Sequence, residues 1–292
     1  MTNLRPIVRD SLTGDGWPVV ATRLAPNDTK ARPRAPVTHS YAALAFYTGG
    51  RSRVELNGEW SLRGGDVLLV PAGEPHRVLE MRGMESWGLA FCVPCFAADG
   101  AASLLGPFER VRDGASAVVH IPSARHVYLE GLFRELEAVG PAARAPRDTV
   151  DAIQRSLLTL ILAEVDRASD ADGPRRGAGG GVVVDALRFI ERHCLGRLTL
   201  NDVAAAIGRS PTYVTSALTQ ATGRSAGQWI VTGRMAEARR LLLHSNEMVD
   251  VIAERVGYAD VTHFIRMFRR THGATPAAWR ASRALARASS DP

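Results

Sequence analysis

Apolar residues recur at helical spacing in the last third of the chain, and the same pattern occurs twice. One copy, AAAIGRSPTYVTSALTQATGRSAGQW, begins at Ala204, and the other, AERVGYADVTHFIRMFRRTHGATPAAW, begins at Ala253. The second copy has one extra residue, and the matched pairs are Ala204/Ala253, Ile207/Val256, Gly208/Gly257, Val214/Phe264, Leu218/Phe268, Gly223/Gly273 and Trp229/Trp279. A repeat of this kind indicates two copies of one supersecondary unit.

Each copy predicts a helix-turn-helix. Gly208 and Gly257 favour a left-handed end to the first helix, because glycine has no Cβ to clash. Ser210-Pro211 and Asp260 are typical of the start of a second helix. Such a motif lays its second helix in the DNA major groove. A plain helical hairpin is the alternative, because it needs the same turn.

The segment WIVTGRMAEARRLLLHS lies between the copies and predicts a helix that joins them. Its apolar stripe consists of Ile230, Met235, Ala238, Leu241 and Leu242. A rigid joint fixes the distance between the two second helices. At a spacing near one turn of duplex, about 34 Å, both helices can enter adjacent major grooves.

Short apolar runs broken by Gly, Asn and Pro fill residues 19 to about 120, which favours an antiparallel sandwich or barrel. The Asn57-Gly58 pair predicts a hairpin there. Beyond Pro122 the apolar period lengthens, and SARHVYLEGLFRELEAV and RDTVDAIQRSLLTLILAEVDRAS predict two helices, the first capped by Ser123. We expect these helices to cover the sheet or to pair with a second copy, which would give a homodimer.

The segment SDADGPRRGAGGG, residues 169–181, contains no large apolar residue and predicts a flexible linker. The expected domains are therefore 1–168 and 182–292, with helix-turn-helix units at about 201–222 and 250–273. The fold class is α+β: an antiparallel β-barrel with two helices, followed by an all-α domain with two helix-turn-helix units joined by a helix.

Positive charge is concentrated in the second domain. The chain holds 36 Lys and Arg against 30 Asp and Glu, a net charge of +6. Residues 182–292 alone hold 15 arginines and nine acidic residues, so the whole excess lies there. A one-sided basic balance favours a polyanionic partner. A generally arginine-rich composition, with Lys30 as the single lysine, is the alternative.

Nothing in the sequence predicts a membrane protein, because the apolar runs are too short to span a bilayer and MTNLRPIVRD is not followed by an apolar stretch. Cys92, Cys95 and Cys194 are too few for a disulfide framework, which favours a reducing cytoplasm, here at the nucleoid. Cys92 and Cys95 form a C-x-x-C that can be redox-active. Buried thiols are the alternative, because the motif follows a strand-like segment and does not open a helix in a βαβ unit.

The tandem units, the joining segment RMAEARRLLL and above all IAERVGYADVTHFIRMFRRTHGATPAAWR resemble the AraC/XylS family of bacterial transcription regulators. The resemblance covers about residues 183–283. The ending of the family, Gly-x-Thr-Pro followed by an aromatic residue and Arg, is represented by Gly273, Thr275, Pro276, Trp279 and Arg280. The first copy departs from the family, because Ser216 stands at its usual Arg position and Thr219 and Gln220 stand where lysines are common.

The resemblance implies which side chains contact DNA. The base-reading candidates are Thr262, His263 and Arg266 in the second unit and Thr212, Thr215 and Ser216 in the first. An arginine can bond guanine O6 and N7 together, whereas Arg269 and Arg270 are expected on phosphates. His263 can also be an ordinary surface residue, and the short side chains of the first unit can simply be solvated. The arginines of the repeat, Arg280 included, are expected to face DNA.

The segment GDVLLVPAGEPHR, with Gly65, Pro71, Gly73 and His76, is similar to the second motif of cupins. This resemblance implies a cupin-like domain that holds a small organic effector, lined by His39, Tyr41, His76 and Trp87. We expect no metal and no cofactor, because the earlier strand region offers His39 alone and Ala43 stands where an acidic ligand would be useful. A domain used for dimerisation alone is the alternative.

These expectations combine into a sequence-specific DNA-binding regulator controlled by a small molecule, and not an enzyme. Its expected partners are a double-stranded operator, the effector and, for an activator, RNA polymerase. An effector-independent regulator is one alternative. A cupin enzyme with a helical docking domain is another, which the missing His-x-His of metal cupins disfavours. Activation and repression use the same contacts, so both stay open.

Overall fold

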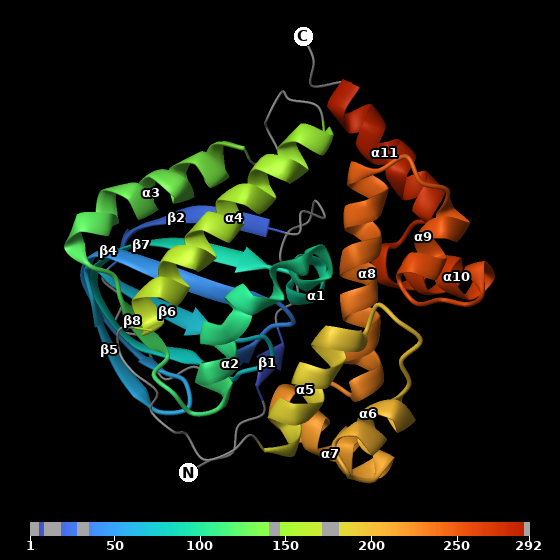
Figure 1. The fold of residues 1–292 in the computed structure, drawn as a ribbon, viewed down its shortest axis with the longest axis horizontal. Helices are drawn as coiled ribbons and strands as arrows, with labels where there is room; N and C mark the ends of the chain where they lie inside the picture. Colours follow the sequence, from blue (N-terminus) through green and yellow to red (C-terminus); the bar gives the residue numbers. More distant parts are fainter. Residues whose placement is uncertain (1–5, 9–18, 28–34, 140–146, 171–180, 289–292) are drawn as a thin grey trace.

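The computed structural model describes residues 6–8, 19–27, 35–139, 147–170 and 181–288 (Figure 1). A mixed α and β part precedes an all-helical part. The strands are β1 (Ile7–Val8), β2 (Val19–Asn27), β3 (Val37–Thr38), β4 (Ala42–Glu55), β5 (Glu59–Arg63), β6 (Asp66–Val70), β7 (Arg77–Phe91) and β8 (Val118–His120). The α-helices of the first part are α1 (Val93–Phe96), α2 (Gly106–Arg112), α3 (Ser123–Ala138) and α4 (Arg147–Asp170). Those of the second part are α5 (Val182–His193), α6 (Leu200–Ala206), α7 (Pro211–Thr222), α8 (Ala226–His244), α9 (Val249–Arg255), α10 (Val261–His272) and α11 (Pro276–Ala288).

The sheet has six strands in the order β2-β7-β4-β6-β8, with β5 paired to the far half of β4. Side chains alternate between its two faces, because successive residues of a strand point to opposite sides. Phe46 and Trp87 lie side by side on one face and stack against Phe133 of α3, at ring distances of 6.2 and 6.1 Å. Helices α3 and α4 cover this face (Figure 1), so the main core lies between sheet and helices.

The sheet differs from the predicted barrel. Among the described strands, β2 and β8 are the two ends of the path and do not pair with each other, and β1 pairs separately with β3. Helices close one face of an open sheet instead, and the kinship of this part with cupins stays a prediction. The Asn57-Gly58 hairpin is confirmed between β4 and β5, with Asn57 at φ 49°. The predicted cap at Ser123 is wrong, because Pro122 takes the cap position and Ser123 is already helical.

Buried ion pairs join the sheet part to the helical part. The guanidinium of Arg112 in α2 donates to both carboxylate oxygens of Glu191 in α5 at 2.6 Å and to the carbonyl of Ala72 at 2.9 Å. The Arg112 side chain is 3% exposed. Burial alone would lower the pKa of Arg112, but the Glu191 carboxylate outweighs it, and the pKa is raised. Arg188 adds a bond to Asp113 at 2.8 Å, so α5 is held in a polar network.

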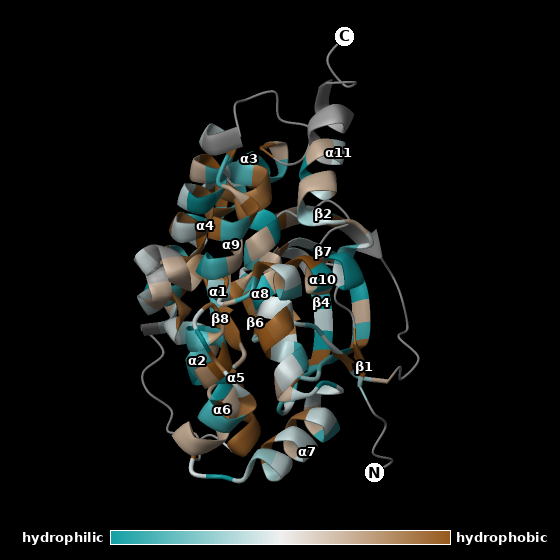
Figure 2. Cartoon of the chain, turned by 90° about the vertical axis from the view of Figure 1, so that its right-hand side faces the viewer, coloured by the Kyte–Doolittle hydropathy of each residue, from teal (hydrophilic) through white to brown (hydrophobic). Residues whose placement is uncertain are grey.

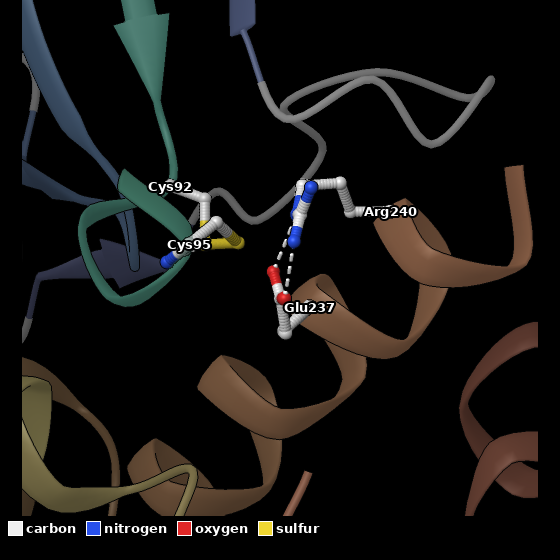
Figure 3. The surroundings of a disulfide bond; sticks show 4 residues. All are labelled: Cys92, Cys95, Glu237 and Arg240. Carbon is white, nitrogen blue, oxygen red and sulfur yellow. Dashed lines mark hydrogen bonds and ion pairs between the residues drawn. A yellow bond between two sulfur atoms is a disulfide. The ribbon is translucent and has the colours of Figure 1, made fainter. Parts of the chain in front are cut away.

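The C-x-x-C motif forms a disulfide in this structure, between Cys92 and Cys95 (Figure 3). The alternative of two buried thiols is wrong, because both residues are buried but joined to each other. The motif follows strand β7, as expected, and opens a short helix that is not part of a βαβ unit. Cys92 is the N-cap of α1, and Pro94 in the first turn fixes a helical backbone that brings the Cα atoms to 5.3 Å, within the usual disulfide range. The remaining thiol, Cys194, is buried, and burial raises its pKa to about 12.

The predicted linker lies largely outside the described residues. Ser169 and Asp170, placed in the linker by the sequence, belong to α4, and Gly181 precedes α5, whereas residues 171–180 are not described. Within the described part of the chain, no helix combines the length and the apolar character needed to cross a membrane.

Loss of the Glu191 carboxylate is expected to weaken the folded state strongly. Glu191→Gln leaves the buried Arg112 charge without its counter-ion, which should cost roughly 3 kcal/mol or more. Glu130→Gln is the matched control, because its partner Arg134 is 65% exposed and a surface pair contributes at most about 0.5 kcal/mol. Urea unfolding measures both, and equal effects of the two changes would contradict a structural role for the buried pair.

Candidate nucleic-acid interface

The first helix-turn-helix is held by local backbone chemistry. Thr199 and Asp202 form a reciprocal capping box at the start of α6, and Gly208 follows this helix at φ 62°. The Ser210 hydroxyl then accepts from the Tyr213 backbone N–H at 3.3 Å and starts α7. Gly223 ends α7 in the left-handed region at φ 76°. These are the residue types that each of these positions favours.

The second unit repeats this geometry with different side chains. Gly257 follows α9 at φ 85°, and Gly273 ends α10 at φ 77°. The Asp260 carboxylate accepts from the Thr262 backbone N–H at 2.8 Å and caps α10. Gly257 has a second reason to be glycine, because a Cβ there would lie 2.4 Å from the Gly196 carbonyl oxygen. The second unit is therefore seated directly on the loop before α6.

Helix α8 belongs to both units. Its first half supplies Trp229 and Ile230 to the core of the first unit. Its second half supplies Ala238 and Leu242 to the core of the second unit, where they join Phe268 of α10. Because one continuous helix is buried in both cores, the two units are held at a fixed separation and rotation.

The two second helices present matching surfaces. From its second to its tenth residue, α7 has the same sequence of exposed, half-buried and buried positions as α10. The four apolar side chains spaced by four residues, Val214, Leu218, Phe264 and Phe268, are 0% exposed. Figure 2 places α7 and α10 on the same flank of α8, with α6 and α9 toward the other side. One extended partner can therefore meet both helices.

The predicted contact residues of α10 are all at the surface. Thr262, His263, Arg266, Arg269 and Arg270 are exposed. The His263 ring also meets the edge of the Tyr258 ring at 5.3 Å, so part of its surface is used inside the protein. Three exposed guanidinium groups on one helix make α10 the cationic member of the pair.

The predicted contact residues of α7 are less uniform. Thr212 and Ser216 are exposed, and Thr215 is half-buried. Two surface residues near them were missed by sequence reasoning. Tyr213, in the first turn of α7, is 53% exposed, and Arg209 is exposed in the turn just before the helix. The signal for Arg209 was its place next to the Ser210 cap, where a helix N-terminus attracts anions.

Two basic residues of the second unit are engaged within the protein. Arg280, expected to face DNA, donates to the carbonyls of Leu242 at 3.3 Å and Glu247 at 2.8 Å, so it ties α11 to the end of α8. This expectation is wrong because carbonyl groups at a helix end attract a guanidinium as phosphate does. Burial, with Arg239 nearby, lowers the pKa of His272 to about 4, so His272 is neutral near pH 7.

The predicted effector residues do not line one cavity. His39 stacks on Tyr41 at 4.1 Å and meets the edge of the His76 ring at 4.9 Å, so these three residues are brought together. Burial and the neighbouring His76 lower the pKa of His39 to about 4. Trp87 lies apart from them, on the sheet face beneath Phe133. Among the described residues, no three His, Cys, Asp or Glu side chains form a metal-binding group.

Known proteins are similar to this chain over the helical part. A family model described as a helix-turn-helix domain matches residues 203–282, which include α7 and α10. The regulatory protein PocR of Salmonella typhimurium is 30% identical over 132 residues, 44% of each chain. The C-terminal domain of AraT, a response regulator from Geobacillus stearothermophilus, is 32% identical, with 35% of this chain and 86% of that chain aligned at a TM-score of 0.34. The DNA-binding domain of AdpA, solved in complex with a target DNA, is 31% identical over 36% of this chain and 92% of that chain, at a TM-score of 0.32.

The chain belongs to the AraC/XylS family of transcription regulators. This family consists of regulators and not of enzymes. The match reaches less than half of the length of PocR. The AraC-type match lies in the helical part, so the sheet part is not described by it.

The seat of Gly257 gives a stability prediction. Gly257→Ala should cost roughly 3 kcal/mol, because a Cβ meets the Gly196 carbonyl and a non-glycine residue is strained at this φ. Gly208→Ala is the control at the equivalent position of the first unit, where φ is 62° and no atom lies within 4 Å. It should cost about 1 kcal/mol. Thermal unfolding compares the two variants, and the steric argument fails if Gly208→Ala is the more harmful change.

Proposed function

We propose that the protein is a sequence-specific DNA-binding transcription regulator. The observation that carries this proposal is the matched exposure of α7 and α10 on one flank of a shared helix. A duplex offers adjacent major grooves about 34 Å apart along one face, and two similarly aimed helices suit such a partner. The AdpA domain, which was solved with a target DNA, is similar over this same region.

The two units contribute different kinds of DNA contact in this proposal. Arg266 is the base reader of α10, with Thr262 and His263 beside it, and Arg269 and Arg270 follow on the phosphates. In α7, Thr212, Thr215 and Ser216 offer methyl and hydroxyl groups, which suit thymine methyls, phosphates and bridging water. The first unit therefore adds selectivity with little electrostatic attraction.

Control by a small molecule belongs to the sheet part. Its support is the direct contact between the parts, because the Thr38 hydroxyl donates to the carbonyl of Thr222, in the last turn of α7, at 3.2 Å. A ligand that shifts this edge of the sheet bears on the placement of α7. An effector-independent regulator is the alternative, and for an activator the further partner is RNA polymerase.

A homodimer is proposed through α3 and α4. Their outer surface carries large apolar side chains in water: Val127 at 84% exposed, Tyr128 at 40%, Ile153 at 37% and Leu160 at 43%. Apolar side chains gathered on neighbouring helices are typical of protein–protein contact. A dimer would bring two pairs of reading helices to one operator.

Arg266→Ala should relax specificity at one base position. The variant loses the two bonds to guanine, so affinity for the preferred base should fall by roughly 1–3 kcal/mol while binding to the other bases changes little. Operator libraries with each base varied in turn measure this profile. An unchanged profile would contradict the assignment of Arg266 to a base.

Arg269→Ala is the companion change and should behave differently. Loss of a phosphate contact should weaken binding to all operators equally and reduce the slope of log K against log salt by roughly one. Fluorescence anisotropy at several salt concentrations gives this slope. A base-dependent loss in Arg269→Ala would place this residue in the groove and not on the backbone.

A further inference from the structure

Three arginines lie side by side at the end of the sheet farthest from the DNA-reading helices. Arg51 of β4 is paired in register with Arg63 of β5 on one side and with Arg82 of β7 on the other. Residues paired in this way project from the same face of the sheet with Cβ atoms about 5 Å apart. Like charges placed directly opposite each other destabilise a sheet. The row therefore costs stability unless something negative lies on it.

The carboxylates of the neighbourhood neutralise only Arg82 of this row. Glu80 is bound to Arg82 at 2.6 Å. Asp66 is engaged by the His120 ring at 2.8 Å and by the backbone N–H of Arg63 at 2.9 Å. Among the described residues, no carboxylate pairs with the side chain of Arg51 or of Arg63. Both of these arginines are exposed, so their donors face solvent.

A further arginine continues the same face one pair along the strands. Arg53 is in register with Ser61 and Glu80, and its own ion pair with Glu59, at 3.5 Å, is half exposed. These arginines line one depression of about 780 Å³, with four guanidinium groups against two carboxylates. Depressions of this size hold small molecules.

We propose that this depression binds a small anion that carries at least two phosphate or carboxylate groups. Guanidinium groups bind such oxygens through paired hydrogen bonds, and two or more anionic groups are needed to bridge the row. Figure 1 places β5 and α10 at opposite ends of the molecule, so DNA on the reading helices is not the occupant. The occupant that the shape and the charge favour is a metabolite-sized polyanion.

The position of the depression also connects it to the helical part. Arg82 lies in the first half of β7 (Arg77–Phe91), and the α1 turn that follows this strand packs Pro94 against Gly233 of α8. Occupation of the depression relieves repulsion in the first half of β7, and the C-terminal end of this strand leads through α1 to the helix that spaces the two reading units. The role of the anion as the effector rests on the proposed function, whereas binding itself does not.

Titration calorimetry on the full chain tests the site. The probes are pyrophosphate and citrate at constant ionic strength, with acetate as the monovalent control. One probe at least should bind the native chain, and Arg51→Gln should weaken it by roughly tenfold or more. Adding Arg63→Gln should abolish binding. Arg134→Gln on α3 removes an exposed arginine elsewhere and should leave the affinity unchanged. The tighter probe distinguishes a phosphate from a carboxylate ligand.

Thermal unfolding without any probe separates a binding site from a structural role. Because Arg51→Gln removes like-charge repulsion, it should melt at the same temperature as the native chain or higher. A clear drop in melting temperature would overturn the proposal, as would probes that bind no better than acetate or bind the double variant normally. Operator affinity with and without the probe is a separate readout. An unchanged affinity removes the effector role, and absent operator binding counts against the proposed function while the calorimetric result stands.

Discussion

The fixed relation between the two reading helices depends on α8, because this one helix is buried in both small cores. A helix-turn-helix alone has too little apolar surface to be a rigid body, and it gains rigidity from what it is packed on. Here both units are packed on α8, which contributes Trp229 to the first core and Leu242 to the second. The close seat of Gly257 on Gly196 adds a direct contact between the units. Any geometry that DNA requires is thus set before DNA arrives, which lowers the cost of ordering on binding.

The helical part is docked to the sheet part by a mixture of polar and apolar contacts. Arg112 reaches Glu191 and the Ala72 carbonyl, and Ala72 itself joins the core of the first unit. On the other side, Arg240 of α8 binds Glu237 (Figure 3) and reaches Asp151 of α4 at 3.3 Å. Buried ion pairs have exacting geometry and contribute little net stability. Such a contact fixes one relative placement of the parts without fusing them into a single apolar core.

Apart from the cap at Ser123, the sequence predicted features whose cause is local and missed those whose cause is tertiary. The glycine ends, the caps at Ser210 and Asp260 and the buried apolar pairs follow from spacing alone, and the structure contains them. Whether Arg280 meets DNA or a carbonyl depends on the end of α8, which lies far away in sequence. Closure of a barrel likewise depends on which strands become neighbours, and periodicity carries no such information. The arginine row was invisible for the same reason, because strand register brings together residues that are separated along the chain.

The contacts between the parts fall unequally on the two units. Helix α5 and the last turn of α7, both in contact with the sheet part, belong to the first unit, whereas the second unit reaches the sheet part only by way of α8, where Arg240 contacts Asp151 among the described residues. The first unit has no basic residue on α7, and the second unit has three exposed arginines on α10. Electrostatic attraction to a duplex acts at long range and does not depend on base sequence. Because α10 carries the exposed arginines, it supplies most of this attraction. Short-range contacts between α7 and DNA form only when α7 is correctly placed. Under the proposed function, a shift of the sheet part can therefore allow or prevent these contacts. Under the proposed function, this division of charge between the two helices assigns anchoring to the second unit and control to the first.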